Sequence, residues 1–122
     1  MKVLFLVAAM LFWGNPIDAQ RHDVVTGPHG GILQEVADLQ VELLVGDRTV
    51  TLYAYSRADV ALEIQNYKAS VVIVSGANRE LVRLRAIDAF RLEGTSNGLL
   101  LPYSSLTLHI TTPTGLAGTV AF

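Results

Sequence analysis

Three histidines are the side chains of this chain that are best suited to bind a transition metal: His22, His29 and His109. His29 lies in a Gly-Pro-His-Gly-Gly stretch at 27–31. Proline fixes its own φ, and the glycines permit a positive φ or close approach by another group. The stretch therefore predicts a turn that leads into a strand starting at Ile32. A second interpretation is that this turn presents the His29 imidazole to zinc or copper.

A second candidate metal site is the N-terminus that cleavage after Ala19 would create, which begins Gln20-Arg21-His22. The amine of Gln20, two deprotonated amides and the His22 imidazole together form a square-planar set of four nitrogens. Copper(II) and nickel(II) prefer that geometry. Cyclisation of the N-terminal glutamine would remove the amine and abolish the site. The plainer interpretation is that His22 is an ordinary residue of a terminal segment.

The other polar groups do not indicate catalysis. Glu42 is a third candidate metal ligand, although carboxylates beside a strand usually form a solvated edge, and alternation places His109 on an exposed strand face. No Ser, Asp or His lies in a recognisable nucleophile setting, and Gly30-Gly31 lacks the pattern of a phosphate-binding loop. The chain contains no cysteine, which excludes disulfides, thiolate metal sites and a cysteine nucleophile. We therefore predict that the protein is not an enzyme.

The charge of the chain does not indicate binding to nucleic acid. The formal net charge is −2 and the isoelectric point is about 5.8, so no general attraction to polyanions is expected. Arg79, Arg83, Arg85 and Arg91 form a mild basic cluster, with Arg83 and Arg85 on one strand face. Without interleaved aromatic residues, this cluster is interpreted as a solubilising face.

The first nineteen residues have the layout of a secretion signal. Lys2 precedes an apolar run from Val3 to Trp13, Pro16 follows, and Ala19 supplies a small residue before a plausible cleavage site. Eleven apolar residues cover about 16 Å as a helix, half of a bilayer core, which argues against a permanent membrane span. The alternative is a core helix of the mature fold. We predict a signal peptide at 1–19 and a periplasmic or secreted domain at 20–122.

The remainder of the chain alternates between apolar and polar residues with a period of two. In Leu39–Val45 the residues Leu39, Val41, Leu43 and Val45 share one face, as expected of a half-buried strand. Further strands are predicted at Thr49–Tyr55, Ser70–Ser75, Leu81–Ala86, Phe90–Leu92, Ser105–Thr111 and Gly118–Phe122. The segment Arg57–Lys68 is predicted either as a short helix or as a link that crosses between two sheets. The fold class is therefore all-β, a single antiparallel, immunoglobulin-like β-sandwich of about seven strands.

A family resemblance appears at the His29 turn. The His-Gly-Gly sequence at 29–31, the Val-Glu-Leu sequence at 41–43 and the Leu-Tyr pair at 52–53 resemble a group of small periplasmic β-domains. Members of that group occur alone or at the N-terminus of heavy-metal efflux adaptor proteins. The resemblance covers the first third of the mature chain and implies a role in transition-metal handling. Members often carry a histidine before the Glu-Leu pair, where this chain has Gln40, so one implied ligand is missing.

Two functional hypotheses follow. The first is an exported, non-catalytic binding module that takes part in copper or zinc handling or in efflux, with His29, His22, Gln20 and Glu42 as candidate ligands. Its partner is then a metal ion or an efflux protein of the envelope. The second is a structural or protein-interaction domain of the cell envelope with no metal role. Tyr53 and Tyr55 on the polar face of their strand favour it, because aromatic residues are enriched at interfaces.

Overall fold

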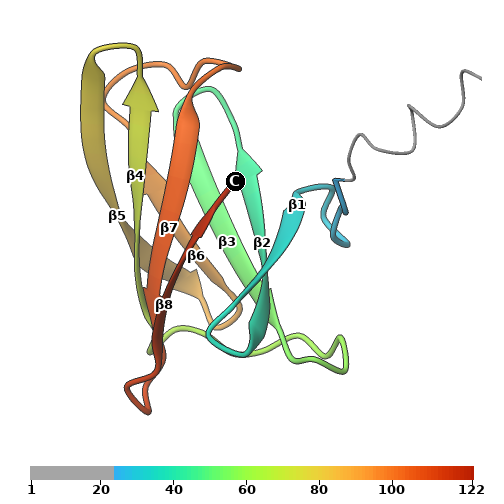
Figure 1. Ribbon diagram of the computed structural model, residues 1–122. Coiled ribbons are helices and arrows are strands. Elements are labelled where there is room, and N and C mark those ends of the chain that lie inside the picture. Colours follow the sequence, from blue (N-terminus) through green and yellow to red (C-terminus); the bar gives the residue numbers. More distant parts are fainter. Residues whose placement is uncertain (1–23) are drawn as a thin grey trace, which may run out of the picture.

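The computed structural model of the chain describes residues 24–122, and these residues form an all-β fold without a helix (Figure 1). The predicted signal peptide and the candidate ligands Gln20 and His22 lie outside the described residues. All strand pairs are antiparallel. The strands are β1 (Ile32–Val36), β2 (Leu39–Val45), β3 (Thr49–Tyr55), β4 (Lys68–Ser75), β5 (Asn78–Asp88), β6 (Arg91–Thr95), β7 (Ser105–Thr111) and β8 (Ala117–Ala121). The predicted fold class is confirmed.

The alternation in the sequence becomes the two faces of the sheet. On β3, Val50, Leu52 and Ala54 are buried in the core, while Thr49, Thr51 and Tyr53, which alternate with them, are only partly covered. The inward residues of the other strands complete one apolar cluster. Burying this cluster is the main source of stability in a chain without disulfides.

The eight strands form one continuous sheet that folds over into two layers. Their order is β1-β2-β3-β6-β5-β4-β7-β8. The long strand β5 joins the layers, because its first part pairs with β4 and its last part pairs with β6, with a register shift between Ala86 and Asp88. The two end strands, β1 and β8, also lie against each other, so the sheet nearly closes on itself (Figure 1).

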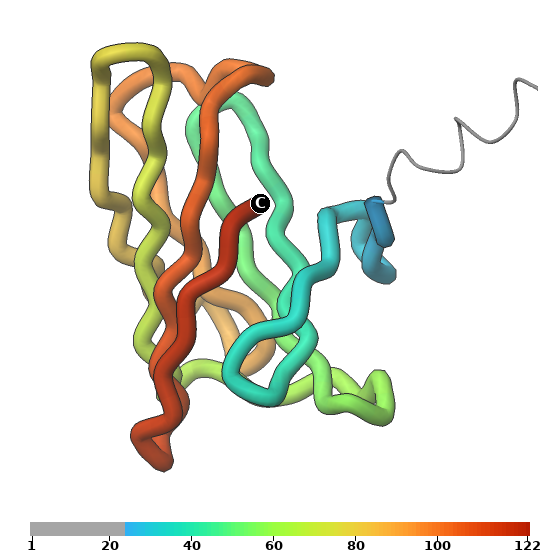
Figure 2. Tube along the Cα trace, viewed as in Figure 1, coloured from blue at the N-terminus to red at the C-terminus, as the bar shows by residue number. Residues whose placement is uncertain are grey.

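The structure corrects the predicted strand count and decides between the two alternatives for segment 57–68. The sheet has eight strands instead of about seven, because the strand that starts at Ile32 pairs with β2 and adds to the seven strands predicted after it. The segment 57–67 is not helical. It runs across the base of the molecule from β3 to β4 (Figure 2), which matches the alternative of a crossing link. Its backbone is held by bonds such as that from Ile64 N–H to the Ala89 carbonyl, and its Ile64 side chain fills the core, which favours the extended path over a helix.

The chain before β1 turns back over the outer face of β2. Leu33 N–H donates to the Val25 carbonyl, and Thr26 forms an isolated bridge with Ile32. The loop between them, residues 27–31, is closed by a hydrogen bond from Gly27 N–H to the Gly31 carbonyl. Residues 24–122 contain no helix that is long and apolar enough to cross a membrane.

Candidate functional site

Glu42 on β2 is fully buried, although strand alternation turns it away from the apolar core. Its Oε2 atom accepts hydrogen bonds from the backbone N–H groups of His29 (2.9 Å) and Gly31 (2.8 Å). Its Oε1 atom accepts the hydroxyl proton of Tyr55 at 2.6 Å and lies 3.0 Å from Nδ1 of His29. These four partners replace the water that the carboxylate loses on burial.

The glycines of the loop allow it to reach this carboxylate. A Cβ atom on Gly27 would collide with the carboxyl group of Glu42, and one on Gly31 would lie 2.6 Å from the carbonyl oxygen of Leu43. Gly30 has a φ of 87°, in the region that favours glycine. The glycine-rich stretch is therefore a turn, as predicted, and it is also a cover fitted closely to one buried side chain.

The His29 ring is held in one orientation by its neighbours. It stacks on the ring of Tyr53, with centroids 3.8 Å apart and planes inclined by 7°. Its Nδ1 atom lies between Oε1 of Glu42 and the hydroxyl oxygen of Tyr55, the latter at 3.1 Å. With Glu42 ionised, Nδ1 carries the proton, and Nε2 of the neutral ring keeps its lone pair. The His29 side chain is 44% exposed, and Nε2 forms no hydrogen bond with residues 24–122.

The ionisation states of the buried pair follow from these contacts. Burial by itself raises the pKa of the Glu42 carboxyl, but the hydrogen bonds from Tyr55, His29 and Gly31 outweigh it and hold the pKa below its ordinary value. Burial and the adjacent Glu42 carboxylate raise the pKa of the Tyr55 hydroxyl well above its usual range. At neutral pH the pair is thus a carboxylate and a neutral phenol that donates to it.

Of the candidate metal ligands, His29 and Glu42 lie in the described region, and their contacts give them different roles. Both oxygens of Glu42 already accept hydrogen bonds, so Glu42 orients His29 and does not offer a free oxygen. Residues 24–122 contain no group of three or more His, Cys, Asp or Glu side chains placed to hold a metal ion. Metal binding by His29, with Gln20 and His22, stays a prediction.

The structure corrects the interpretation of the two tyrosines on β3. Tyr55 is only 7% exposed and Tyr53 is partly covered by the His29 ring, so neither forms a free contact surface. Sequence reasoning missed their role because the covering loop precedes β1, far from β3 along the chain. The signal that was available is the occurrence of Glu42 and Tyr55 on the same outer face of a predicted hairpin.

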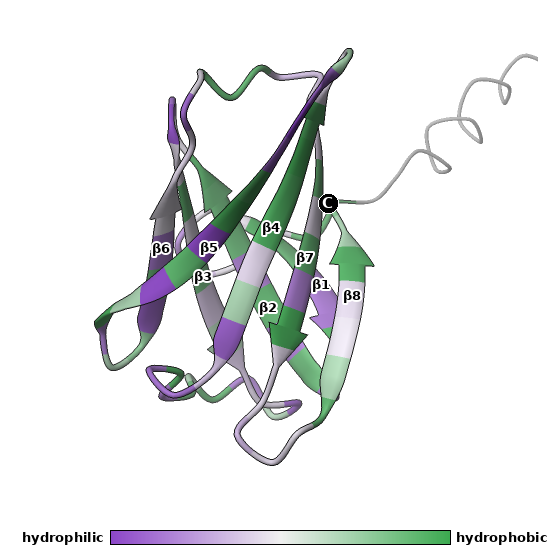
Figure 3. Cartoon of the chain, turned by 90° about the vertical axis from the view of Figure 1, so that its left-hand side faces the viewer, coloured by the Kyte–Doolittle hydropathy of each residue, from purple (hydrophilic) through white to green (hydrophobic). Residues whose placement is uncertain are grey.

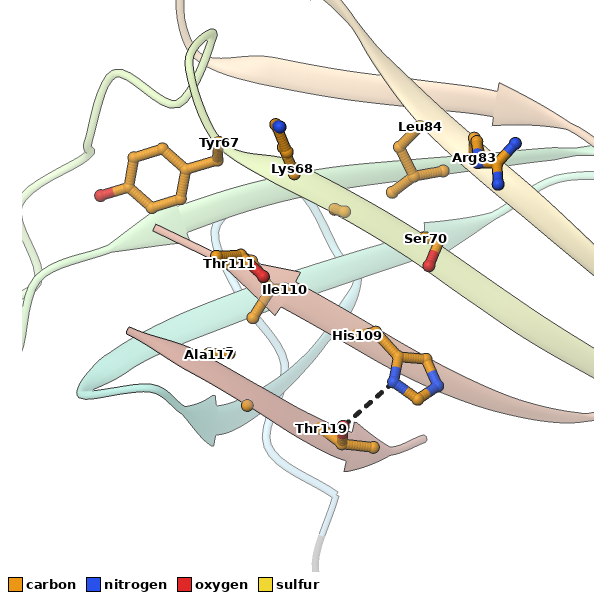
Figure 4. A pocket seen from close by; sticks show the side chains of 12 residues that line it. Tyr67, Lys68, Ser70, Arg83, Leu84, His109, Ile110, Thr111, Ala117 and Thr119 are labelled. Carbon is orange, nitrogen blue, oxygen red and sulfur yellow. Dashed lines mark hydrogen bonds between the residues drawn. The ribbon is translucent and has the colours of Figure 1, made fainter. Parts of the chain in front are cut away.

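A second polar group of residues lies on the outer face of β4, β5, β7 and β8. This layer faces the viewer in Figure 3. A depression of about 610 Å³ opens there, and its lining includes Lys68, Arg83 and His109 (Figure 4). His109 is exposed, as predicted from alternation, and its Nδ1 atom lies 3.1 Å from Oγ1 of Thr119.

An exposed apolar surface occupies the end of the sandwich where β6 connects to β7. The Leu-Leu-Leu-Pro-Tyr sequence at 99–103 forms this connection, and we call it the apolar loop. Leu99 is 59% exposed, Tyr103 is 73% exposed, and Val45 beside the loop is 46% exposed. Leu100 is partly buried against the core and its N–H donates to the Asp47 carbonyl at 2.7 Å, which anchors the loop.

Comparison with known proteins adds little to this description. No protein-family model and no curated protein matches the chain, so the resemblance to efflux-associated domains stays a prediction. Among solved structures, one similar chain is the archaellum periplasmic stator protein FlaG from Sulfolobus acidocaldarius, at 15% identity and a TM-score of 0.41, over 69% of this chain and 99% of that one. Another is from the complex of archaellum periplasmic stator proteins FlaF and FlaG of the same organism, at 13% identity and a TM-score of 0.44, over 84% of this chain and 100% of that one.

Proposed function

We propose that this chain is an exported, non-catalytic protein-interaction domain of the cell envelope, and that it contacts its partner through the apolar loop and Val45. The observation that carries the proposal is the clustering of Leu99, Leu101, Tyr103 and Val45 at one end of the sandwich, each more than a third exposed. Exposed apolar side chains that gather in one region of a surface commonly mark protein contacts.

The composition of the loop suits a protein partner. Residues 99–103 carry no charge, charged residues are depleted at the centre of interfaces, and tyrosine is among the residues enriched there. The hydrogen bond from Leu100 to Asp47 and the partial burial of Leu100 fix the loop before any partner binds. A pre-organised loop loses less conformational entropy on association. The envelope location rests on the predicted signal peptide.

Site-specific photo-crosslinking in the cells that encode the protein tests this proposal. A photoreactive phenylalanine analogue at Tyr103 should give one discrete adduct, which the double variant Leu99→Ser/Leu101→Ser should abolish. The matched control places the same analogue at Phe90, which is 43% exposed elsewhere on the surface. The proposal fails if Tyr103 gives no adduct, or if both positions give the same adducts.

Metal binding is a second candidate function, favoured by the pairing of His29 with Glu42. Histidines that ligate a metal through one ring nitrogen commonly donate the other N–H to a carboxylate, which fixes the ring. Here Nδ1 of His29 faces the carboxylate and Nε2 keeps the lone pair.

Titration with copper(II) and zinc(II) of the processed chain separates the two predicted metal sites. If His29 is the ligand, His29→Ala should weaken binding while His22→Ala should not. Binding that depends only on His22 assigns the metal to the N-terminus instead. Unchanged binding in both variants would remove both candidate sites.

A further inference from the structure

The outer face of the β5-β4-β7-β8 layer carries a row of polar side chains that no sequence motif predicts. In the strand register Ser70 lies opposite Arg83 on one side and His109 on the other, and His109 lies opposite Thr119. Figure 4 shows these four side chains on adjacent strands. Strand pairing thus brings together residues that are up to about fifty positions apart in the sequence, on one surface.

A second row, two residues further along β4, β7 and β8, completes a shallow depression. Lys68 lies opposite Thr111, and Thr111 lies opposite Ala117, so an ammonium group and a second hydroxyl join the first row. The lining of the depression also includes Tyr67 at its edge and contains no carboxylate (Figure 4). We call this surface the basic depression.

The cations of this surface are not used in ion pairs. Lys68, Arg83 and the adjacent Arg85 form no ion pair with residues 24–122, although each is exposed. By contrast, Arg57 pairs with a carboxylate at 3.0 Å and Arg91 with another at 3.2 Å. Glu93 lies opposite Arg85 in the register of β5 and β6, whereas the strand pairing places no acidic residue opposite Lys68 or Arg83. Two exposed cations near each other without a carboxylate beside them attract an anion to this surface.

The mixture of groups specifies the class of anion. A guanidinium offers a planar fork of donors that matches a carboxylate, and the ammonium of Lys68 adds a second charge close by. The hydroxyls of Ser70, Thr111 and Thr119 can exchange hydrogen bonds with alcohol groups. The depression is open and lies on a sheet face, so a chain of several units fits it better than one enclosed small molecule. Carboxylates alternating with alcohols along a chain are the chemistry of an acidic polysaccharide.

We propose that the basic depression binds an acidic, uronate-containing polysaccharide of the cell exterior, with Lys68 and Arg83 holding its carboxylates and Ser70, Thr111 and Thr119 holding its hydroxyl groups. This site lies on the sheet face and is separate from the apolar loop, which sits at the opposite end of β4 (Figure 1). The proposal therefore does not depend on the protein partner.

Calorimetric titration of the processed domain with polyuronate oligosaccharides (alginate) tests it, with neutral dextran oligosaccharides of equal length as the comparison. The double variant Lys68→Gln/Arg83→Gln should lose about tenfold or more in affinity, as expected when two charge-assisted contacts are removed. The matched control Arg57→Gln/Arg91→Gln removes the same number of charges from other surfaces and should change the affinity by less than about twofold, because surface charges away from the ligand contribute little.

Four results would overturn the proposal. Absence of alginate binding would do so, and so would an equal loss in the two double variants, which would indicate a general charge effect. A charge-neutral variant, Ser70→Ala/Thr119→Ala, should weaken alginate binding, and unchanged affinity would remove the assignment to a sugar.

Vesicles of phosphatidylcholine and phosphatidylglycerol in equal parts serve as the lipid comparison. Tighter binding to these vesicles than to alginate, dependent on Lys68 and Arg83, would assign the surface to lipid instead.

Discussion

At the scale of single residues, Glu42 is the side chain on which the N-terminal loop depends. A buried carboxylate is costly to keep in a fold unless its oxygens are satisfied, and here four donors satisfy them. Three of these bonds tie the loop to β2, and the fourth, from Tyr55, ties β3 to β2. The carboxylate therefore stabilises the fold by connecting a loop to a hairpin, and removing its charge should loosen both.

Neutralising Glu42 tests this role. Glu42→Gln replaces one acceptor oxygen with an amide NH₂ group, which accepts no hydrogen bond, so two of the four donors lose their acceptor. We expect a loss of about 2 to 3 kcal/mol in the free energy of unfolding, and about 1 to 2 kcal/mol for Tyr55→Phe, which removes one donor only. Urea unfolding of the processed domain measures both. A Glu42→Gln variant as stable as the parent would contradict the role assigned to the carboxylate.

The free energy of unfolding should also depend on pH through the Glu42 carboxyl. Because the pKa of Glu42 is lower in the folded chain than its ordinary value of 4.5, the folded state holds this proton less tightly than the unfolded state does. The contribution of the ionised form is thus fully present above about pH 4.5 and is lost as the pH falls through the lower folded pKa. Parent and Glu42→Gln should therefore converge in stability under acid conditions. A difference between them that does not shrink below pH 4.5 would argue against this linkage.

At the scale of elements, the loop at 27–31 and the β2–β3 hairpin form one unit. The loop approaches the hairpin so closely that Gly31 has no room for a Cβ atom next to the Leu43 carbonyl. This contact involves backbone, which cannot move aside as a flexible side chain can. The fit of the loop is therefore set by the backbone of β2 as well as by the Glu42 carboxylate.

A glycine comparison tests the fit. Gly31→Ala should destabilise the domain by about 1 to 3 kcal/mol, the usual cost of overpacking. Gly98→Ala is the matched control, since a Cβ atom there meets no neighbour within 4 Å and its φ is not in the left-handed region. Thermal unfolding followed by circular dichroism compares the two. Similar midpoints for the two variants would contradict the close approach of the loop.

The sequence predicted local elements well and the candidate sites poorly, for one physical reason. The period of two in Leu39–Val45 and Thr49–Tyr55 is a local property, and both strands have the bounds that it predicted. The burial of Glu42 depends on a loop that reaches it from another part of the chain. The row from Arg83 to Thr119 depends on the register of four strands. Neither can be deduced from periodicity, which gives the face of a residue but not what covers that face.

At the scale of the whole molecule, the two layers depend on each other. Strand β5 belongs to both, since Val82 and Leu84 lie where it pairs with β4, and its last residues pair with β6. The core cluster likewise draws on both layers, with Leu52 from one and Leu108 from the other, each fully buried. A shared strand and a shared core make the layers one cooperative unit.

Core substitutions in opposite layers test this cooperativity. Leu52→Ala and Leu108→Ala should each lower the free energy of unfolding by about 2 to 5 kcal/mol, as is typical when a buried leucine leaves a cavity. Each should shift a single transition without changing its slope in denaturant, because the surface exposed on unfolding stays the same. In a background in which Tyr67 and Tyr103 are replaced by phenylalanine, tyrosine fluorescence reports on the β2–β3 layer through Tyr53 and Tyr55, while far-ultraviolet circular dichroism reports on all strands. If the layers unfolded independently, Leu108→Ala would separate the two signals into distinct transitions, whereas a shared core requires them to coincide in both variants.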